Sequence, residues 1–173
     1  RCRSPDDRGF HRGQDGRGVA VALQGRRQLP LVNGLLPAKG AMMLAVRLSK
    51  PAPIEHLPLA SAQIVVAAPG PGQIRLHVRA CGVCHTDLGF YYGGVRVKHA
   101  LPLTLGHEGA GVVDKLGPGV RGVEIGESVL VYGPWGCGRC YPCSKGEEND
   151  CDRGIRAPGI FTAGAMADYM IVD

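Results

Sequence analysis

The sequence contains no long hydrophobic run and rather little charge. Of its 173 residues, 45% are hydrophobic and 20% are charged, a balance that can supply a core and argues against wholesale disorder. It has no stretch of about 18 or more apolar residues, which excludes a transmembrane helix. The short apolar stretch 19–23 is followed at once by Gln24, Gly25 and two arginines, so it does not fit a secretory signal. We therefore expect a cytoplasmic protein without a membrane partner.

A dinucleotide-binding fingerprint is missing as well. No G-x-G-x-x-G follows a predicted strand with an acidic residue about 20 positions later. Residues 13–18 read G-x-x-G-x-G, but no strand is predicted before them. We expect no Rossmann unit within this sequence.

Positive charge is concentrated at the start of the chain. The net charge is +5, yet residues 1–40 hold eight basic and three acidic side chains, so the remainder is neutral. A basic arm that binds nucleic acid would carry interleaved aromatic side chains or a partner motif, and this segment has neither. We expect no nucleic-acid partner.

The leading segment also differs from the rest in its pattern. Residues 1–41 show neither helical nor strand periodicity, whereas Met42 and Met43 open an apolar run over 44–46. We predict that residues 1–41 are a disordered or upstream extension and that Met42 or Met43 is the natural start. Residues 42–173 are predicted to form one domain.

Glycine and proline are abundant, with 27 and 13 copies, which favours short strands joined by many turns. Residues 74–79 alternate apolar and polar side chains, which predicts a half-buried strand. Only residues 85–92 have room for a short helix. Further strands are predicted at 44–46, 110–113, 128–132 and 165–172. The fold class is therefore mainly β.

The cysteine pattern is the most informative feature. Four cysteines are spaced C-x2-C-x2-C-x7-C in a loop rich in glycine and proline: Cys137, Cys140, Cys143 and Cys151. Such spacing lets three thiolates converge on one ion while the fourth returns to complete a tetrahedron, which is typical of structural zinc. An iron–sulfur cluster is an alternative, although its usual cysteine run closes with a three-residue gap and a proline. Disulfides or idle thiols are another, although no export signal accompanies them.

A second group combines Cys81 and Cys84 with the downstream His107. A thiolate and an imidazole from separate segments would give a zinc ion two protein ligands, with room for a third ligand and an exchangeable position. Open coordination suits catalysis, because the ion can polarise an alcohol or carbonyl oxygen. The C-x-x-C pair could instead be a redox pair, and a lone histidine can be structural. Spacing alone leaves these alternatives open.

Three parts of the sequence carry a resemblance to a known family. They are residues 82–87, residues 106–111 with the following Gly117 and Val120, and the cysteine quartet. Together they resemble the zinc-containing medium-chain alcohol dehydrogenases. The resemblance runs from about Met43 to Asp173. It implies an irregular GroES-like β-barrel with a zinc-binding lobe and few short helices. It also implies that the family's Rossmann domain and third catalytic zinc ligand lie C-terminal to this part, so that the chain is an N-terminal fragment, inactive alone.

The resemblance implies roles for individual residues. Cys84 and His107 would be ligands of the catalytic zinc, and the quartet would hold the structural zinc. Thr86 matches the hydroxyl that hydrogen-bonds the substrate oxygen and relays its proton. Cys81 is then a small buried side chain or a redox partner of Cys84.

Three more positions carry implied roles. Asp87 resembles the carboxylate that orients the zinc-bound histidine, and Glu108 resembles a carboxylate beneath the zinc that replaces a displaced ligand. His85 matches a position that faces the cofactor pyrophosphate. Gly89 departs from the pattern, because many family members carry a histidine there at the outer end of the proton relay. Trp135 either walls the substrate cleft or covers the zinc lobe.

The resemblance thus implies an NAD(P)-dependent oxidoreductase that interconverts small alcohols and aldehydes or ketones by zinc-assisted hydride transfer. It is compatible with a homo-oligomeric full-length protein. The alternative is a stand-alone zinc-binding barrel with a structural or binding role.

Overall fold

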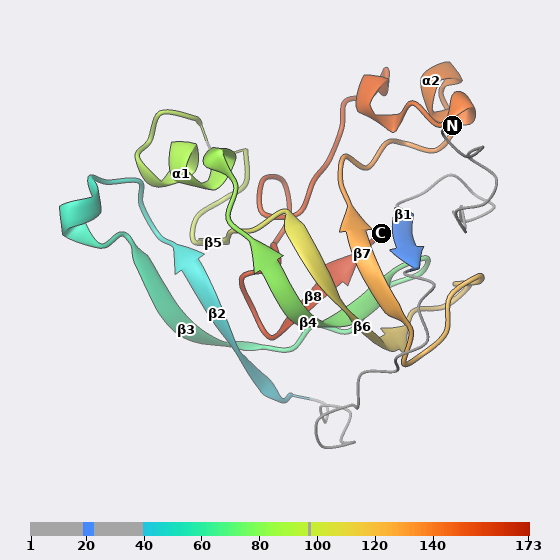
Figure 1. The fold of residues 1–173 in the computed structure, drawn as a ribbon, viewed down its shortest axis with the longest axis horizontal. Coiled ribbons are helices and arrows are strands. Elements are labelled where there is room, and N and C mark those ends of the chain that lie inside the picture. The colour runs from blue at the N-terminus through green and yellow to red at the C-terminus, as the bar shows by residue number, and fades with distance from the viewer. Residues whose placement is uncertain (1–18, 23–39, 97) are drawn as a thin grey trace, which may run out of the picture.

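The computed structural model describes residues 19–22, 40–96 and 98–173, and these residues are mainly β, as the sequence predicts (Figure 1). The strands are β1 (Val19–Ala22), β2 (Met42–Leu48), β3 (Leu59–Val65), β4 (Ile74–Gly82), β5 (Leu103–Thr104), β6 (Glu108–Leu116), β7 (Ser128–Tyr132) and β8 (Tyr169–Val172). The helices are α1 (His85–Tyr91) and α2 (Tyr141–Lys145), with single 3-10 turns at Ile54–His56 and Glu148–Asp150.

The larger sheet has five strands in the order β1-β7-β6-β4-β8, and each neighbouring pair is antiparallel. Its inner face holds the main core cluster: Ile74, Leu76, Val113, Val129, Val131, Trp135, Ala165, Met170 and Val172. Strand β4 pairs with β6 along its whole length, from Ile74 opposite Leu116 to Gly82 opposite Glu108. The ends of these two strands therefore lie side by side just before α1 and just after His107.

The smaller sheet has the order β3-β2-β5 and carries a second core cluster. In this cluster Phe90 of α1 packs with Leu48, Leu103 and Leu105. Helix α1 is thus fixed to the segment that leads directly into His107. Helix α2 lies at the other end of the molecule (Figure 1).

Arg75 is buried, although it occupies a polar position of the alternating strand 74–79. Its side chain is 4% exposed and forms hydrogen bonds of 2.7–3.1 Å to both carboxylate oxygens of Asp114 on β6. The third nitrogen donates to the Ala67 carbonyl oxygen. The ion pair with Asp114 lets a charged side chain occupy a buried position. The local pattern cannot reveal this, because Asp114 lies 39 residues away in the sequence.

Other predicted boundaries are also corrected. Helix α2 exists although only 85–92 was predicted to be helical. The last strand begins at Tyr169, because residues 165–168 make their backbone hydrogen bonds mainly to other segments. Within residues 1–41 the structure describes one strand, β1, which pairs with β7 from Val19 opposite Tyr132 to Ala22 opposite Val129. Residues 1–18 and 23–39 lie outside the described residues.

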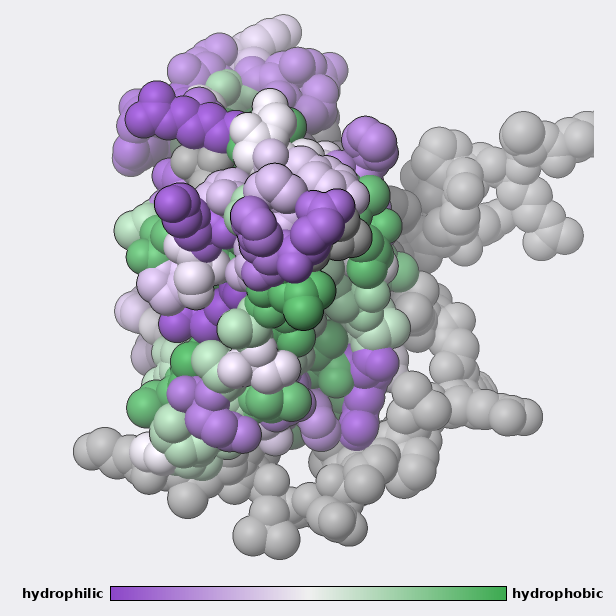
Figure 2. All heavy atoms as spheres, turned by 90° about the vertical axis from the view of Figure 1, so that its left-hand side faces the viewer, coloured by the Kyte–Doolittle hydropathy of each residue, from purple (hydrophilic) through white to green (hydrophobic). Residues whose placement is uncertain are grey.

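Among the described residues, no helix is long and apolar enough to span a membrane. The end of the molecule that carries α1 exposes polar and apolar residues side by side (Figure 2).

Candidate metal centres

The four cysteines of the C-x2-C-x2-C-x7-C pattern come together. The sulfur atoms of Cys137, Cys140, Cys143 and Cys151 all lie within 4.8 Å of one another. They are free thiols, with Cys143 and Cys151 buried. The structure therefore contains no disulfide among these four cysteines. Four sulfur donors at this separation fit a tetrahedral, closed zinc site.

Local backbone geometry builds this lobe. Helix α2 begins after Cys140 with Pro142 in its first turn and ends at Gly146, which adopts a left-handed φ of 80°. A proline in the first turn and a glycine just past the end are ordinary helix boundaries. At Gly136 a Cβ would lie 2.5 Å from the Cys143 sulfur, so only glycine lets the backbone pass beside that sulfur.

The thiols of the lobe differ in acidity. Hydrogen bonds, the first of them from the backbone N–H of Arg139, lower the pKa of Cys137 to about 6. Burial raises the pKa of Cys143 to about 12. Backbone donors therefore already favour a thiolate at Cys137, whereas Cys143 needs a cation to become one.

The second predicted site also assembles. The ligand atoms of Cys84, His107 and Glu108 lie within 4.8 Å of one another. Cys84 immediately precedes α1, His107 immediately precedes β6, and Glu108 begins that strand. At Gly82 a Cβ would lie 2.1 Å from Oε2 of Glu108, so Gly82 leaves the room that the carboxylate occupies.

Asp87 ties the two halves of this site together. Its side chain is 3% exposed. One carboxylate oxygen accepts a hydrogen bond from the backbone N–H of Cys84 at 3.0 Å, and the other accepts one from Gly106 at 3.1 Å. The second oxygen also lies 3.6 Å from Nδ1 of His107.

The imidazole of His107 is placed as a metal ligand would be. Its Nδ1 is buried, and within the described part of the chain it makes no hydrogen bond. A shift of a few tenths of an ångström would bring it into hydrogen-bond range of Asp87. When Nδ1 carries the proton and faces a carboxylate, the unprotonated Nε2 keeps a lone pair that can bind a metal ion. Zinc-bound histidines adopt this arrangement. The donor set of thiolate, imidazole and carboxylate fits zinc with an open position.

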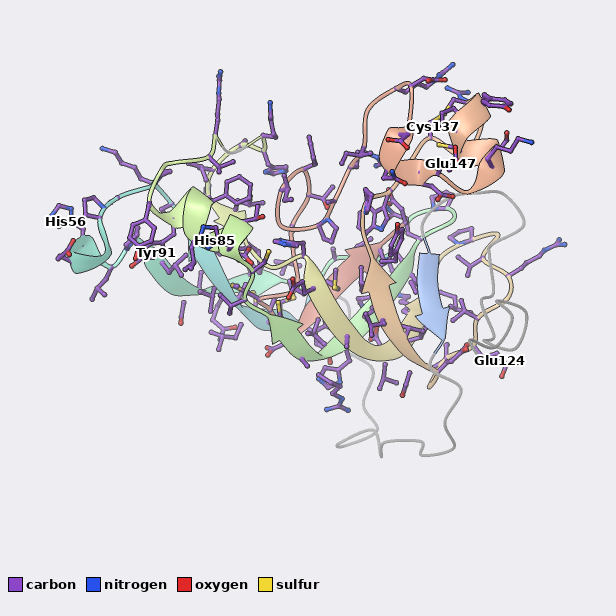
Figure 3. The ribbon with its side chains drawn as sticks, turned by 45° about the horizontal axis from the view of Figure 1, so that its top comes forward. His56, His85, Tyr91, Glu124, Cys137 and Glu147 are labelled. Atoms are coloured by element: carbon purple, nitrogen blue, oxygen red, sulfur yellow. The ribbon has the colours of Figure 1, made fainter. Side chains whose placement is uncertain are left out.

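The other two predicted residues lie on α1. Thr86 is half-buried, and its Oγ1 lies 3.7 Å from the sulfur of Cys84. His85 is exposed. Its position and that of Cys137 lie on well-separated parts of the molecule (Figure 3), so the two candidate centres are distinct.

Cys81 is half-buried and lies outside both groups of candidate metal ligands. Burial, followed by the carboxylates of Asp87 and Glu108, raises the pKa of its thiol. A Cβ at Gly106 would lie 2.5 Å from its sulfur. Cys81 thus packs as a small side chain beneath the segment that carries His107.

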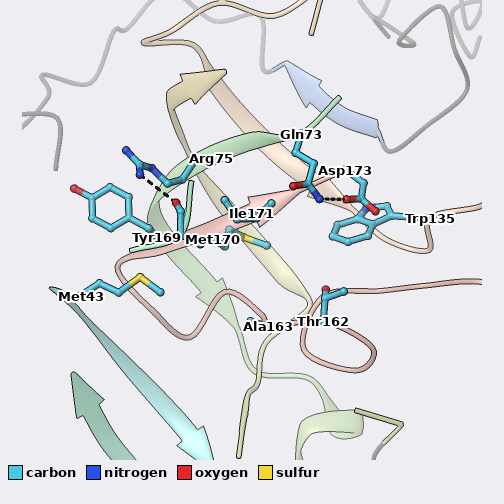
Figure 4. A pocket seen from close by; sticks show the side chains of 11 residues that line it. Met43, Gln73, Arg75, Trp135, Thr162, Ala163, Tyr169, Met170, Ile171 and Asp173 are labelled. Atoms are coloured by element: carbon cyan, nitrogen blue, oxygen red, sulfur yellow. Dashed lines mark hydrogen bonds between the residues drawn. The ribbon is translucent and has the colours of Figure 1, made fainter. Parts of the chain in front are cut away.

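Trp135, for which the sequence left open a place at the substrate cleft or over the zinc lobe, belongs to the main core cluster. It is 2% exposed and donates from Nε1 to the Tyr132 carbonyl oxygen at 2.7 Å. It lines a pocket of about 220 Å³ together with Met43, Tyr169 and Met170 (Figure 4). At one end of this pocket Gln73 donates a hydrogen bond to Asp173.

Sequence reasoning missed the loop that supports His107. Residues 157–166 follow the zinc lobe and pack against Leu105 and Gly106 through backbone hydrogen bonds. Their glycines and small residues gave no signal in the sequence, because these hydrogen bonds join residues 59 to 61 positions apart.

The fold and the sites together define a mainly β domain with one closed and one open candidate metal centre. The family model of the alcohol dehydrogenase GroES-like domain matches residues 70–173. An alcohol dehydrogenase from Geobacillus stearothermophilus is 43% identical over 101 residues, which are 57% of this chain and 29% of that protein. L-threonine 3-dehydrogenase from Pyrococcus abyssi is 37% identical over 134 residues, 75% of this chain and 36% of that protein.

A solved structure is similar as well. The cobalt- and zinc-bound thermostable alcohol dehydrogenase from Pyrobaculum aerophilum superposes with a TM-score of 0.68 and 35% identity, covering 76% of this chain and 39% of that one. The chain belongs to the zinc-type alcohol dehydrogenase family and contains its GroES-like domain. It spans about a third of the length of the curated relatives it matches.

Proposed function

We propose that this chain is the zinc-binding catalytic part of an NAD(P)-dependent dehydrogenase that interconverts small alcohols and aldehydes or ketones. The observation that carries the proposal is the convergence of Cys84, His107 and Glu108 within 4.8 Å. These ligand types, unlike the closed sulfur quartet, leave a coordination position for a substrate oxygen.

When bound, zinc supplies a Lewis acid for the substrate oxygen and NAD(P) exchanges the hydride. Cys84 and His107 hold the ion. Asp87 fixes the positions of both, because its two oxygens bind the backbone N–H groups of Cys84 and Gly106. Its charge also favours the His107 tautomer with a proton on Nδ1.

The remaining residues handle the proton and the anionic cofactor. Thr86 lies beside the Cys84 sulfur, where its Oγ1 can accept the proton of the substrate hydroxyl and pass its own to water. Glu108 offers a carboxylate at the edge of the site. His85, exposed on the first turn of α1, can donate a ring N–H to a cofactor phosphate.

The sulfur quartet has a different task. We propose that it holds one structural zinc, since four thiolates close the coordination sphere. The thiols have to stay reduced to bind metal, which fits the predicted cytoplasmic location.

The proposal also covers what the chain does not do alone. The one G-x-G-x-x-G of the sequence, residues 117–122, lies in the turn between the strands β6 and β7 and is not followed by a helix. It therefore does not form a dinucleotide-binding unit, and the cofactor has no recognisable site in this sequence. We expect the 173-residue chain to bind zinc in the quartet tightly, to bind a second zinc more weakly, and to show no turnover.

The test combines metal analysis with an activity assay. Zinc per chain is measured for the wild type, for Cys84→Ser with His107→Ala, and for Cys137→Ser with Cys140→Ser. Each double variant should lose one site and keep the other. NAD-dependent alcohol oxidation is then assayed on the wild-type chain. Robust turnover would contradict the need for a separate cofactor domain, and zinc in the quartet with none at Cys84 would favour a stand-alone zinc-binding barrel.

A further inference from the structure

We infer that the loop 157–166 positions His107, and that Gly159 and Gly164 are the positioning residues through which it acts. The inference rests on the proposed function insofar as it makes His107 a metal ligand. The contacts of Gly159 and Gly164 with Gly106 involve only backbone atoms and do not depend on a metal.

Gly106 is the point that the loop supports. It directly precedes His107, adopts a φ of 94°, and donates its N–H to Asp87. On one side, a Cβ at Gly106 would lie 2.5 Å from the Cys81 sulfur and 3.1 Å from the backbone nitrogen of Met166. A displacement of Gly106 would therefore have two effects at once. It would move His107, and it would break the hydrogen bond from Gly106 to Asp87.

The two loop glycines close the other sides of Gly106. A Cβ at Gly159 would lie 2.7 Å from the backbone nitrogen of Gly106 and 2.8 Å from its carbonyl carbon. A Cβ at Gly164 would lie 2.3 Å from the Gly106 oxygen and 2.7 Å from Cα of Gly159. Three backbones therefore touch where any side chain would push Gly106 away.

Backbone hydrogen bonds hold the loop in this place. Gly164, Ala165 and Met166 donate to the carbonyl oxygens of Thr104, Gly106 and Leu105 at 2.9, 2.9 and 3.0 Å. The segment 104–106 is thus held from one side by the loop and from the other by Asp87. The loop is consequently part of the frame that fixes where the imidazole lies.

The chain contains a matched control for the glycines. Gly154 lies in the same connecting segment with a φ of 81°, close to the 69° of Gly159. Among the described residues, nothing lies within 4 Å of a Cβ built on Gly154. Alanine at either position incurs the same left-handed backbone strain, but only at Gly159 does the methyl group collide with Gly106.

The experiment measures amide hydrogen exchange of Gly106 by NMR in the full chain with zinc in the quartet. We expect Gly159→Ala and Gly164→Ala to exchange about tenfold faster or more at this amide, and Gly154→Ala to stay close to the wild type. Unchanged amide exchange of Val113 and Val129, which belong to the main core cluster, shows that the barrel is folded in each variant. Equal Gly106 exchange in Gly159→Ala and Gly154→Ala would overturn the inference.

A second readout concerns the metal. Zinc protection of Cys84 from alkylation, followed by mass spectrometry, should need about 10- to 100-fold more zinc in the two loop variants than in Gly154→Ala. Cys84 left unprotected in the wild type would contradict the proposed function, whereas the exchange result would still judge the positioning role.

The wild-type chain supplies a test that needs no substitution. If the loop holds Gly106, the amides of Gly106, Ala165 and Met166 should open as one unit, with the same dependence of exchange on denaturant. Opening of Gly106 independently of the two loop amides would overturn the inference even where the variants fail to fold.

Discussion

The two candidate metal centres are built in opposite ways. The quartet draws all its ligands from residues 137–151, a segment that is folded around the sulfur atoms and has little other core. The second centre joins the end of β4, the start of α1 and the start of β6, so its geometry depends on the barrel. A local site can survive damage to the rest of the fold, whereas an assembled one cannot.

Removing the quartet's metal should have the largest effect. In Cys143→Ser the lobe loses a ligand, and structural zinc contributes about 10–16 kcal/mol in small zinc domains. We expect residues 137–156 to become sensitive to limited proteolysis while β4 and β6 stay protected. Cys81→Ser, which alters a half-buried thiol outside the quartet, should leave the lobe resistant. Loss of the whole barrel in Cys143→Ser would contradict the independence of the two regions.

The ion pair between Arg75 and Asp114 allows the opposite test, in which the barrel is weakened and the lobe is left intact. Asp114→Ala leaves the Arg75 guanidinium buried without its partner, and we expect a loss of about 3–5 kcal/mol in the free energy of unfolding. Measured against denaturant, Cys84 should lose its zinc protection well before the quartet releases zinc. Lys115→Ala, at the exposed neighbouring position on β6, should change neither midpoint. Simultaneous release from both centres would contradict the comparison.

Asp87 affects only the assembled centre. Asp87→Asn keeps the shape of the side chain but removes the charge that faces His107, and we expect zinc affinity at Cys84 to fall by about 10- to 100-fold. Zinc affinity of the quartet should be unchanged. The exposed Asp152, close to Cys151 in the lobe, provides the control as Asp152→Asn. A loss of quartet zinc in Asp87→Asn would show that the centres are not separate.

The smallest expected effect concerns thiol reactivity immediately after a chelator removes zinc, while the backbone of the lobe still has its folded shape. In that form the pKa of Cys137 is about 6, lowered by backbone hydrogen bonds, and the pKa of Cys143 is about 12, raised by burial. At pH 7 the first is mostly thiolate and the second is mostly thiol. Iodoacetamide should therefore label Cys137 first, and labelling of Cys137 should slow as the pH falls below 6. Equal labelling rates would contradict the acidity difference.

The features that could be predicted from the sequence are mostly the local ones, and most of those that could not depend on long-range contacts. The quartet was readable because its spacing is local, and the strand over 128–132 was found with its observed ends. The helix at 85–92 was found to within one residue. The burial of Arg75 was not predicted, because alternation carries no information about a partner on another strand. Helix α2 was missed because five residues with a proline give no periodicity, and Gly159 and Gly164 were missed because their contacts are long-range.

Trp135 lies between the two regions. It is the sole tryptophan of the sequence, it is buried in the barrel core two residues before Cys137, and its backbone pairs with Arg156 just after the lobe. The molecule therefore carries its single tryptophan fluorophore at the junction. Its emission wavelength reports whether lobe and barrel remain joined, so the order in which they separate can be followed without an added label.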